Sequence, residues 1–307
     1  MPQVLQRDEL AAWCEQWLGA TPTQRLFEIA HLSIVVGLRL TDGREVVVKA
    51  RPPADRIQGC VYVQRHLWAA GFPCPEPLVG PTPIGALTAT AEAFVPGGMS
   101  LEPGPDSPRL FAEALAELIR LAPSVASVPT LAPPPAWVWW DHDQPGTWPL
   151  PDDRDTDLNA HSEPVWLEDI GRRVRRRLAQ CQASPVVGHA DWEEPNLRWI
   201  DRRLHVVHDW DSIVGRPEAT IAGVAAAVCP GLGGPGMAML EETETFLLAY
   251  EQARGHRWSR EEREVCWAAG LWIRAYNAKK DAVDGIGGAL LERLASEVAE
   301  RLRLAGA

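Results

Sequence analysis

The sequence of 307 residues predicts an α+β protein whose first third is rich in β-strands and whose remainder is largely helical. Alternating apolar and polar residues over 23–50 indicate strands, and an Asp-Gly pair between two β-branched runs is typical of a hairpin turn. Later, PRLFAEALAELIRLA (108–122) has apolar residues at helical spacing. We therefore expect two domains, covering residues 1–98 and 99–307.

Local signals predict the remaining elements of the first domain. Helical spacing in DELAAWCEQWL (8–18) predicts a helix that ends at a glycine, and residues 55–70 are predicted to form a second helix. ALTATAEAFVPGG (86–98) predicts a strand that runs into a loop. The expected domain therefore contains an N-terminal helix, an antiparallel sheet, one further helix and a hinge near residues 92–98.

The second domain is predicted to contain helices and one unusual insert. Residues 123–166 hold nine prolines and five tryptophans, and we expect this insert to be ordered because indoles require burial or a ligand. Five arginines in the predicted helix over 172–178 are interpreted as a solvated face. Ser259 to Glu262 has the form of a capping box before a long helix, and a terminal helix is expected over 288–304.

Composition excludes several classes of protein. The N-terminus shows no secretory signal, and the longest uncharged stretch, 221–240, is broken by prolines and glycines, so we expect no membrane helix. Six widely spaced cysteines without a CxxC pair favour reduced thiols and a cytoplasmic location over zinc or disulfides.

Charge is unevenly distributed along the chain. The net charge is −11; residues 1–99 hold 8 Lys/Arg against 9 Asp/Glu, whereas residues 100–307 hold 22 against 32. Such an acidic surface argues against a nucleic-acid partner, because neutralising phosphates requires a basic face. It permits attraction of a cationic ligand, while solubility alone explains the charge equally well.

The stretch VVGHADWEEPNLRWIDRRLHVVHDWDS (186–212) concentrates the residues that suggest chemistry. A hairpin formed by NLRW and LHVVHD would fold Asn196 and Asp209 toward one another. An amide oxygen and a carboxylate are hard ligands of the kind that Mg²⁺ prefers, and Mg²⁺ brings further ligands of its own. Asp191, at the start of the loop, would then face an approaching nucleophile. A turn network around Asp191 and a strand-end cap at Asp209 are the structural alternatives.

The motifs HADWEEPN and HDWDS resemble the catalytic loop and metal strand of the aminoglycoside phosphotransferase and choline kinase-like family, with Ala190 in place of the usual glycine. Three further fragments occur in the expected order: DGREVVVKA, QRHLWAAGFPCPEPL and AEAFVPGG. The resemblance extends over about residues 25–280. It implies a protein-kinase-like two-lobe fold, with a small β-rich N-lobe and a larger helical C-lobe, and transfer of a nucleotide γ-phosphate to a hydroxyl.

The resemblance also implies roles for individual residues. Asp191 would accept or orient the proton of the substrate hydroxyl, and Asn196 and Asp209 would hold Mg²⁺. Lys49 would bind the phosphates of ATP or GTP, unless it is a surface strand lysine. Supporting roles are expected for His189 (orienting the loop), Asp211 (an outer metal partner), Ser33 (a hydrogen bond to phosphate), and the backbone of Glu92, Ala93, Phe94 and Val95 (binding the base).

Three features depart from the family pattern. The first-lobe helix, which should present a glutamate to Lys49, offers only Gln58 and Gln64. The first hairpin lacks the glycines that let a loop close over phosphates. Glu218 or Thr220 would have to replace an aspartate that bonds the catalytic loop.

The acceptor remains open at this stage between aminoglycoside-like and other small hydroxyl compounds, and the C-lobe charge suggests a cation. Candidate acceptor-binding residues are Glu193, Trp148, Asp152, Asp153, Asp155, Trp267, Trp272, Tyr276 and Asn277. Core packing is the alternative for the late-helix residues, and a solvated loop edge is the alternative for Glu193. Two functions therefore stand: a small-molecule kinase, or a kinase-fold nucleotide-binding protein with little or no transfer activity. The sequence leaves the oligomeric state undefined.

Overall fold

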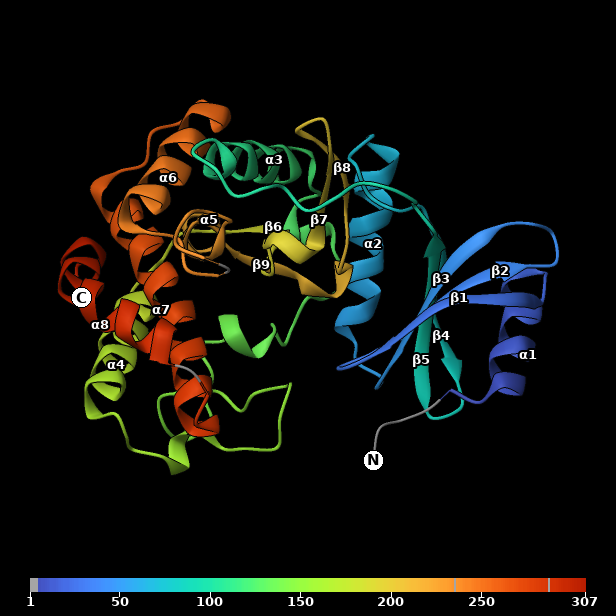
Figure 1. The fold of residues 1–307 in the computed structure, drawn as a ribbon, viewed down its shortest axis with the longest axis horizontal. Helices are drawn as coiled ribbons and strands as arrows, with labels where there is room; N and C mark the ends of the chain where they lie inside the picture. The colour runs from blue at the N-terminus through green and yellow to red at the C-terminus, as the bar shows by residue number, and fades with distance from the viewer. Residues whose placement is uncertain (1–4, 235, 287) are drawn as a thin grey trace.

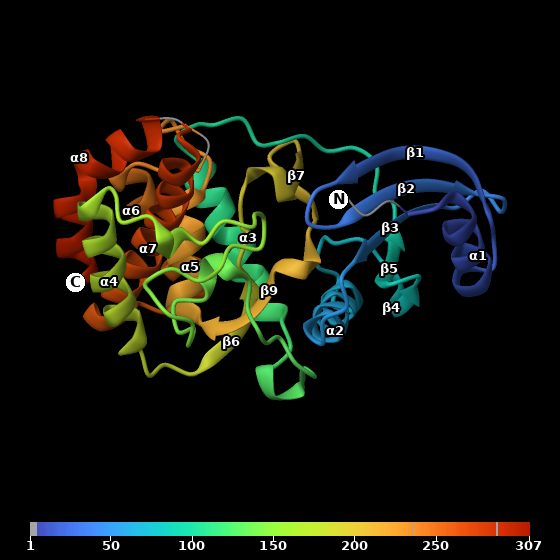
Figure 2. The ribbon, with the colours of Figure 1, turned by 90° about the horizontal axis from the view of Figure 1, so that it is seen from below.

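The α+β class is confirmed by the computed structural model, which describes residues 5–234, 236–286 and 288–307 (Figure 1). A β-rich lobe comes first and a mostly helical lobe follows it. Figure 2 shows an extended connection running from β5 to α3 between the two lobes. Within the described ranges, no helix is long and apolar enough to cross a membrane.

The first lobe is built on an antiparallel sheet with strand order β1-β2-β3-β5-β4. Its elements are α1 (Arg7–Leu18), β1 (Pro22–Ala30), β2 (Ile34–Leu40), β3 (Glu45–Arg51), α2 (Arg56–Ala69), β4 (Pro77–Ile84) and β5 (Leu87–Ala93). Helix α1 covers the outer face of the sheet, and α2 lies on the side of the helical lobe (Figure 1). These bounds agree closely with the two helices and the hairpin that the sequence predicts.

Alternation along β3 decides which side chains face the second lobe. Val46, Val48 and Ala50 are completely buried in the core shared with α1. Lys49 therefore points to the opposite face, because successive strand residues alternate between faces. Lys49 lies beside Val35 of β2 and Thr90 of β5, so the lysine stands in the middle of the inner face.

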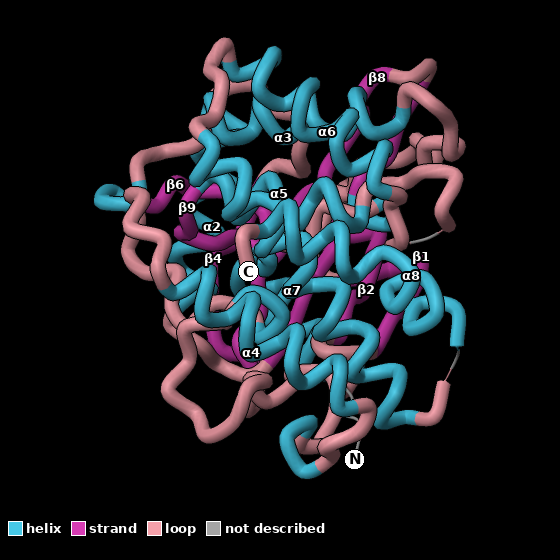
Figure 3. The backbone as a smooth tube through the Cα atoms, turned by 90° about the vertical axis from the view of Figure 1, so that its left-hand side faces the viewer, coloured by secondary structure: helices cyan, strands magenta, loops and turns pink. Residues whose placement is uncertain are grey.

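The second lobe surrounds its strands with helices. Its elements are α3 (Ser107–Leu121), α4 (Val165–Ala179), β6 (Pro185–His189), β7 (Leu197–Ile200), β8 (Arg203–Val207), β9 (Ile213–Pro217), α5 (Glu218–Val228), α6 (Leu240–Arg254), α7 (Arg260–Asp284) and α8 (Gly288–Ala305). Viewed from the helical end, α4, α7 and α8 lie in front of the strands (Figure 3). The capping box before α7 is confirmed by reciprocal hydrogen bonds between Ser259 and Glu262.

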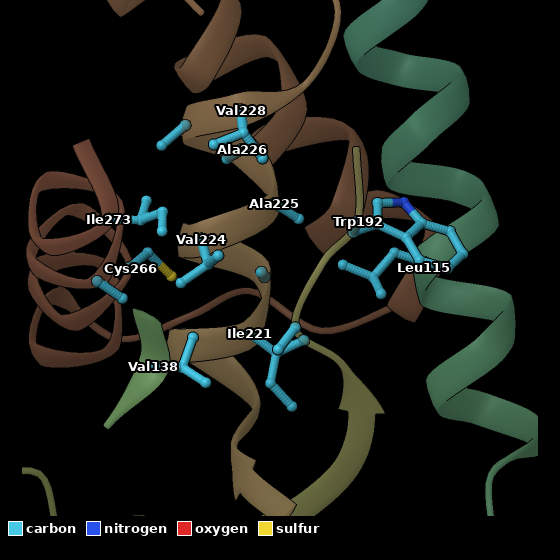
Figure 4. Packing of buried hydrophobic residues seen from close by; sticks show 14 of the residues in the cluster. Leu115, Val138, Trp192, Ile221, Val224, Ala225, Ala226, Val228, Cys266 and Ile273 are labelled. Atoms are coloured by element: carbon cyan, nitrogen blue, oxygen red, sulfur yellow. The ribbon is translucent and has the colours of Figure 1, made fainter. Parts of the chain in front are cut away.

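Helix α5 forms the centre of this lobe. Its residues from Ala219 to Val228 are all buried, and Figure 4 shows its side chains between α3 and α7. A Cβ at Gly223 would lie 2.1 Å from the carbonyl oxygen of Cys266. The glycine therefore allows the backbones of α5 and α7 to approach closely, which fixes the two helices that line the site described below.

The insert over 123–166 is ordered, as predicted, because it is anchored by buried indoles and basic side chains. Trp148 is fully buried and donates through Nε1 to Glu168 at 2.8 Å. Lys279 of α7, also fully buried, pairs with Glu168 at 2.6 Å and donates to the carbonyl oxygens of His161 and Glu163.

Two arginines hold the other half of the insert. The Arg216 guanidinium binds Asp141 through two 2.6 Å hydrogen bonds and lies 4.9 Å from the ring centroid of Trp140. Arg175 donates to the carbonyl oxygens of Trp140, His142 and Gly146. The interpretation of the arginines over 172–178 as a solvated face is therefore wrong for Arg175, whose guanidinium binds three backbone carbonyls, and for Arg177, which is buried and pairs with Glu264 at 3.2 Å.

Candidate active site

Two strand pairs bring the acidic loops together. β6 pairs with β9, and the N–H of Ala190 donates to the carbonyl of Ser212 at 2.8 Å. β7 and β8 form the predicted hairpin, and at its open end the N–H of His208 donates to the carbonyl of Asn196 at 2.8 Å. Asn196 and the residue before Asp209 are thus backbone neighbours, as the hairpin predicts.

The loop after β6 is fixed by side-chain hydrogen bonds. Asn196 Nδ2 donates to both the carbonyl (2.9 Å) and the carboxylate (2.7 Å) of Asp191. His189 Nδ1 accepts from the N–H of Asp191 at 3.2 Å, so Nε2 carries the proton and donates to the carbonyl of His208 at 3.1 Å. The His189 ring lies edge-on between Trp192 and Trp210. This histidine orients the loop backbone and is buried away from any substrate.

The two aspartates of the site differ sharply in proton affinity. Burial, and then the negative charges of Glu193 and Asp209, raise the pKa of Asp191 to about 8. Burial acts in the same direction on Asp209, but Lys49 and a 2.6 Å hydrogen bond from Ser212 outweigh it, so the pKa of Asp209 lies well below its usual range. Asp209 also adopts a left-handed conformation with φ 57°, the kind of backbone strain often found at functional sites.

Lys49 is bound by carboxylates from the second lobe. Its Nζ lies 2.5 Å from Asp209 Oδ1 and 2.9 Å from Asp211 Oδ2. Arg51 adds a 2.7 Å contact to the other oxygen of Asp211. Although burial acts to lower it, the pKa of Lys49 is raised because these two carboxylates stabilise the charged form. Lys49 therefore faces the interior of the cleft. Because α2 supplies no acid, the carboxylates that pair with Lys49 come from the segment between β8 and β9.

Helix α2 is tied to the backbone of residues 211–213 by another residue. Arg56, at the first position of α2, donates to the carbonyl oxygens of Asp211 and Ile213. Cys60, one turn later, places its Sγ 3.8 Å from the carbonyl of Asp211. Sequence reasoning missed Arg56, because its partners are backbone atoms more than 150 residues away.

The hinge after β5 offers fewer free donors than predicted. The N–H of Ala93 donates to Glu76, and the N–H of Phe94 donates to Glu45, at 2.9 and 3.0 Å. These two donors are therefore not available to a nucleotide base, which corrects part of the prediction for the backbone of 92–95. Phe94 packs its ring 5.9 Å from that of Phe27, at the edge of the inner face of the sheet.

A cleft between the lobes opens at Asp191. One pocket of about 480 Å³ is lined by Asp191, Glu193, Asp209 and Lys280. It also contains Ser33, Asp152, Asp153, Asn277 and an apolar wall of Trp137, Val224, Val228 and Ile273. A second pocket of about 380 Å³ is lined by Lys49, Arg51, Arg56, Asp211 and prolines of the insert. The two pockets share Ser33, Trp137, Asp152 and Asp209, so they form adjoining arms of one cleft.

The carboxylates of the larger arm are not equivalent. Asp153 pairs with Lys280 at 2.6 Å and with Arg154 at 3.0 Å. Burial acts to raise the pKa of Asp153, but these two cations outweigh burial and lower the pKa to about 2. Glu193 and Asp152 form no ion pair among the residues that the structure describes. Burial raises the pKa of each of them. Besides Asp191, this arm therefore presents two carboxylates that have no ion-pair partner among the described residues.

Several predicted acceptor residues lie elsewhere. Four of these residues are buried in the helical core, where tilted rings pack on one another or against Arg301: Trp148, Trp267, Trp272 and Tyr276. They do not line the two arms of the cleft, and neither does the exposed Asp155. The residues that sequence reasoning missed are Trp137, Lys280 and the apolar wall. Helical spacing gave one signal for Lys280. Residues three apart are neighbours on a helix, so Lys280 lies on the same face as Asn277, which was a predicted acceptor residue.

The loop between β6 and β7 is not fixed by the acid expected after β9. Glu218 accepts from Tyr250 at 2.8 Å and from Arg254 at 2.7 Å, so it joins α5 to α6. Thr220 donates to the carbonyl of Pro217 at 2.7 Å. The expectation that either residue bonds the loop is therefore wrong; the N–H of Ala190 and the side chains of His189 and Asn196 fix that loop.

The donor set near Asp209 fits a divalent cation that brings ligands of its own. No group of three or more His, Cys, Asp or Glu side chains arranged to hold a metal occurs within the described ranges. Asn196 uses its Nδ2 group to bind Asp191, which leaves its amide oxygen as the donor atom. One amide oxygen and one or two carboxylates suit Mg²⁺ carried by nucleotide phosphates, rather than a metal held by the protein alone.

The two-lobed fold is of the protein-kinase-like class. The chain matches the phosphotransferase enzyme family (APH) over residues 35–261 and belongs to this family. No curated protein matches the chain.

Solved structures share the fold. Amicoumacin kinase hAmiN, in complex with AMP-PNP, Ca²⁺ and Ami, has a TM-score of 0.62 at 13% identity, covering 93% of this chain and 89% of its own. Spectinomycin phosphotransferase APH(9)-Ia, in complex with ADP and spectinomycin, gives 0.60 at 12% identity, covering 99% and 94%. An aminoglycoside phosphotransferase from Alicyclobacillus acidocaldarius gives 0.56 at 13%, covering 93% and 91%. These matches confirm the kinase-like fold.

Proposed function

We propose that the protein is a small-molecule kinase that transfers the γ-phosphate of ATP or GTP to a hydroxyl of an amine-bearing, aminoglycoside-like acceptor. One observation carries the proposal. The Asp191 carboxylate, fixed by Asn196, opens into a cleft of about 480 Å³ that also contains Asp209. A proton acceptor and a ligand for a metal–nucleotide complex therefore border the same space.

In the proposed reaction, the acceptor oxygen attacks the γ-phosphorus while the bond from that phosphorus to the β–γ bridging oxygen breaks. The nucleoside diphosphate leaves, and the hydroxyl proton passes to the Asp191 carboxylate. Asn196 and Asp209 would hold Mg²⁺, which neutralises charge on the phosphates when it is bound. Lys49, on the inner face of the sheet, would bind the phosphates, and Asn196 keeps the Asp191 carboxylate aimed at the cleft.

An amine on the acceptor is supported by the charges of the larger arm. The half-buried Glu193 and the exposed Asp152 lie in the cleft without ion-pair partners among the described residues, so a substrate ammonium could pair with both carboxylates. Asp153 is already paired with Lys280 and contributes little further attraction. Spectinomycin and aminoglycosides, named for the structural relatives, are consistent with such an acceptor.

The test is a transfer assay with radiolabelled ATP and GTP against a panel of hydroxyl compounds with and without amino groups. We expect Mg²⁺-dependent phosphorylation of an amine-bearing member, and a loss of at least about 100-fold in kcat for Asp191→Asn, since general-base groups contribute on this scale. Glu194→Gln, on the same loop, is the control. Equal turnover by the wild type and Asp191→Asn would contradict the proposal.

One observation favours the alternative of a nucleotide-binding protein with little transfer activity. Lys49 is held by both Asp209 and Asp211, and α2 provides no glutamate to draw it away. Under this alternative, nucleotide binds with Mg²⁺ but no panel member is phosphorylated. Binding and transfer measured on the same preparation separate the two functions.

A further inference from the structure

Glu92, at the end of β5, occupies a constrained position on the inner face of the sheet. It lies beside Val47, while Lys49 lies beside Thr90, so Glu92 is the diagonal cross-strand neighbour of Lys49. Diagonal neighbours have Cα atoms about 7–8 Å apart, within reach of long side chains. The Glu92 carboxylate therefore belongs to the same face of the cleft as the Lys49 ammonium.

Helix α2 holds this carboxylate in place. Gln64, only 4% exposed, donates through Nε2 to Glu92 at 2.7 Å and to the carbonyl of Pro75 at 3.1 Å. The glutamine is thus used as a clamp on Glu92 and does not pair with Lys49. A buried amide with two acceptors has little freedom to turn, so the carboxylate is preorganised.

The cations that face Glu92 are otherwise engaged. Lys49 and Arg51 both exert attraction on the Glu92 carboxylate, but Lys49 is paired with Asp209 and Asp211, and Arg51 with Asp211. In the described part of the chain, Glu92 itself forms no ion pair. Glu92 is therefore a half-buried acid whose neighbouring lysine is occupied by the two carboxylates that a metal–nucleotide complex would require.

We propose that Glu92 becomes the carboxylate partner of Lys49 when a magnesium–nucleotide complex binds. This inference rests on the proposed function and deepens it by naming a positioning residue. A divalent cation at Asp209 competes with the lysine for that carboxylate, since both cannot share its oxygens at full strength. Lys49 then needs another acid to keep its ammonium aimed at the phosphates, and the strand β5 supplies it in place of helix α2.

The test is a measurement of nucleotide affinity with a fluorescent ATP analogue. The wild type and Glu92→Gln are each measured in Mg²⁺ and in EDTA. Glu92→Gln keeps a hydrogen-bonding side chain against Gln64 but removes the charge. We expect Kd to rise about 10-fold with Mg²⁺, equivalent to about 1.4 kcal/mol. With EDTA we expect a change below about 2-fold, because Lys49 then remains on Asp209 and Asp211.

Glu45→Gln is the matched control. Glu45 also lies on the sheet, but its partner is the exposed Arg39. The Kd of Glu45→Gln for the nucleotide should therefore equal that of the wild type in both Mg²⁺ and EDTA. The role of Glu92 would be overturned if Glu92→Gln and the wild type bound the nucleotide equally well in Mg²⁺, or if the variant lost the same affinity with and without Mg²⁺. Either result would leave the proposed function standing. A wild-type protein that binds no nucleotide in Mg²⁺ would overturn both this inference and the proposed function.

Discussion

Removing the ammonium of Lys279 should destabilise the helical lobe more than removing any exposed cation. Lys279 is fully buried and pairs with Glu168, whose side chain is 19% exposed. Breaking a buried pair from one side costs about 3–5 kcal/mol, because the remaining charge is left without compensation. Water can reach Glu168 in part, so we expect Lys279→Met to lower the free energy of unfolding by about 3 kcal/mol, the low end of that range.

A second substitution separates charge from packing. Glu168→Gln, combined with Lys279→Met, removes the unpaired charge and keeps an oxygen that accepts from Trp148 Nε1. We expect the double variant to recover about 2 kcal/mol, since residues in one network couple on this scale.

The assay is urea unfolding, followed by both tryptophan fluorescence and far-UV circular dichroism. Arg109→Met, which removes an exposed cation paired with Glu113, is the control and should change stability by less than about 0.5 kcal/mol. A loss below about 1 kcal/mol for Lys279→Met, or a double variant no more stable than the single one, would refute the reasoning.

Two further predictions follow from the site and its supporting helices. In the proposed reaction Asp191 must be ionised to accept a proton, and its pKa is raised to about 8, so kcat/KM for the acceptor should rise with pH through this region. Glu193→Gln should move this rise to lower pH by removing a negative charge, while Glu194→Gln should move it less. A pH–rate profile checks this, and an unchanged profile for Glu193→Gln would contradict it. Gly223→Ala, which brings a methyl group to 2.1 Å from the Cys266 carbonyl oxygen, should lower the free energy of unfolding by about 3 kcal/mol, the upper end of the usual cost of overpacking, as measured by urea unfolding.

Sequence reasoning identified the elements whose signals are local. Period-two alternation placed the strands of the first lobe, and the spacing within HADWEEPN and HDWDS anticipated that the loop and the hairpin would meet. The direction of Lys49 also follows from alternation, since its neighbours Val48 and Ala50 are buried. These features depend on backbone geometry that a few adjacent residues determine.

Partners from distant parts of the chain were not predictable in the same way. Lys49 and Asp209 are separated by 160 positions, and nothing local indicates that a lysine without a helix glutamate will pair with the segment between β8 and β9. The insert presents the same difficulty, because its tryptophans follow no period. Composition alone therefore could not distinguish Trp148, which is buried in the core, from Trp137, which lines the cleft.

The contacts of Arg56 have a consequence for the movement of α2. Its guanidinium fastens the start of α2 to the backbone on either side of Ser212, so an outward movement of this helix must either break both hydrogen bonds or carry residues 211–213 with it. The position of α2 and the position of the Asp211 carboxylate are therefore mechanically coupled.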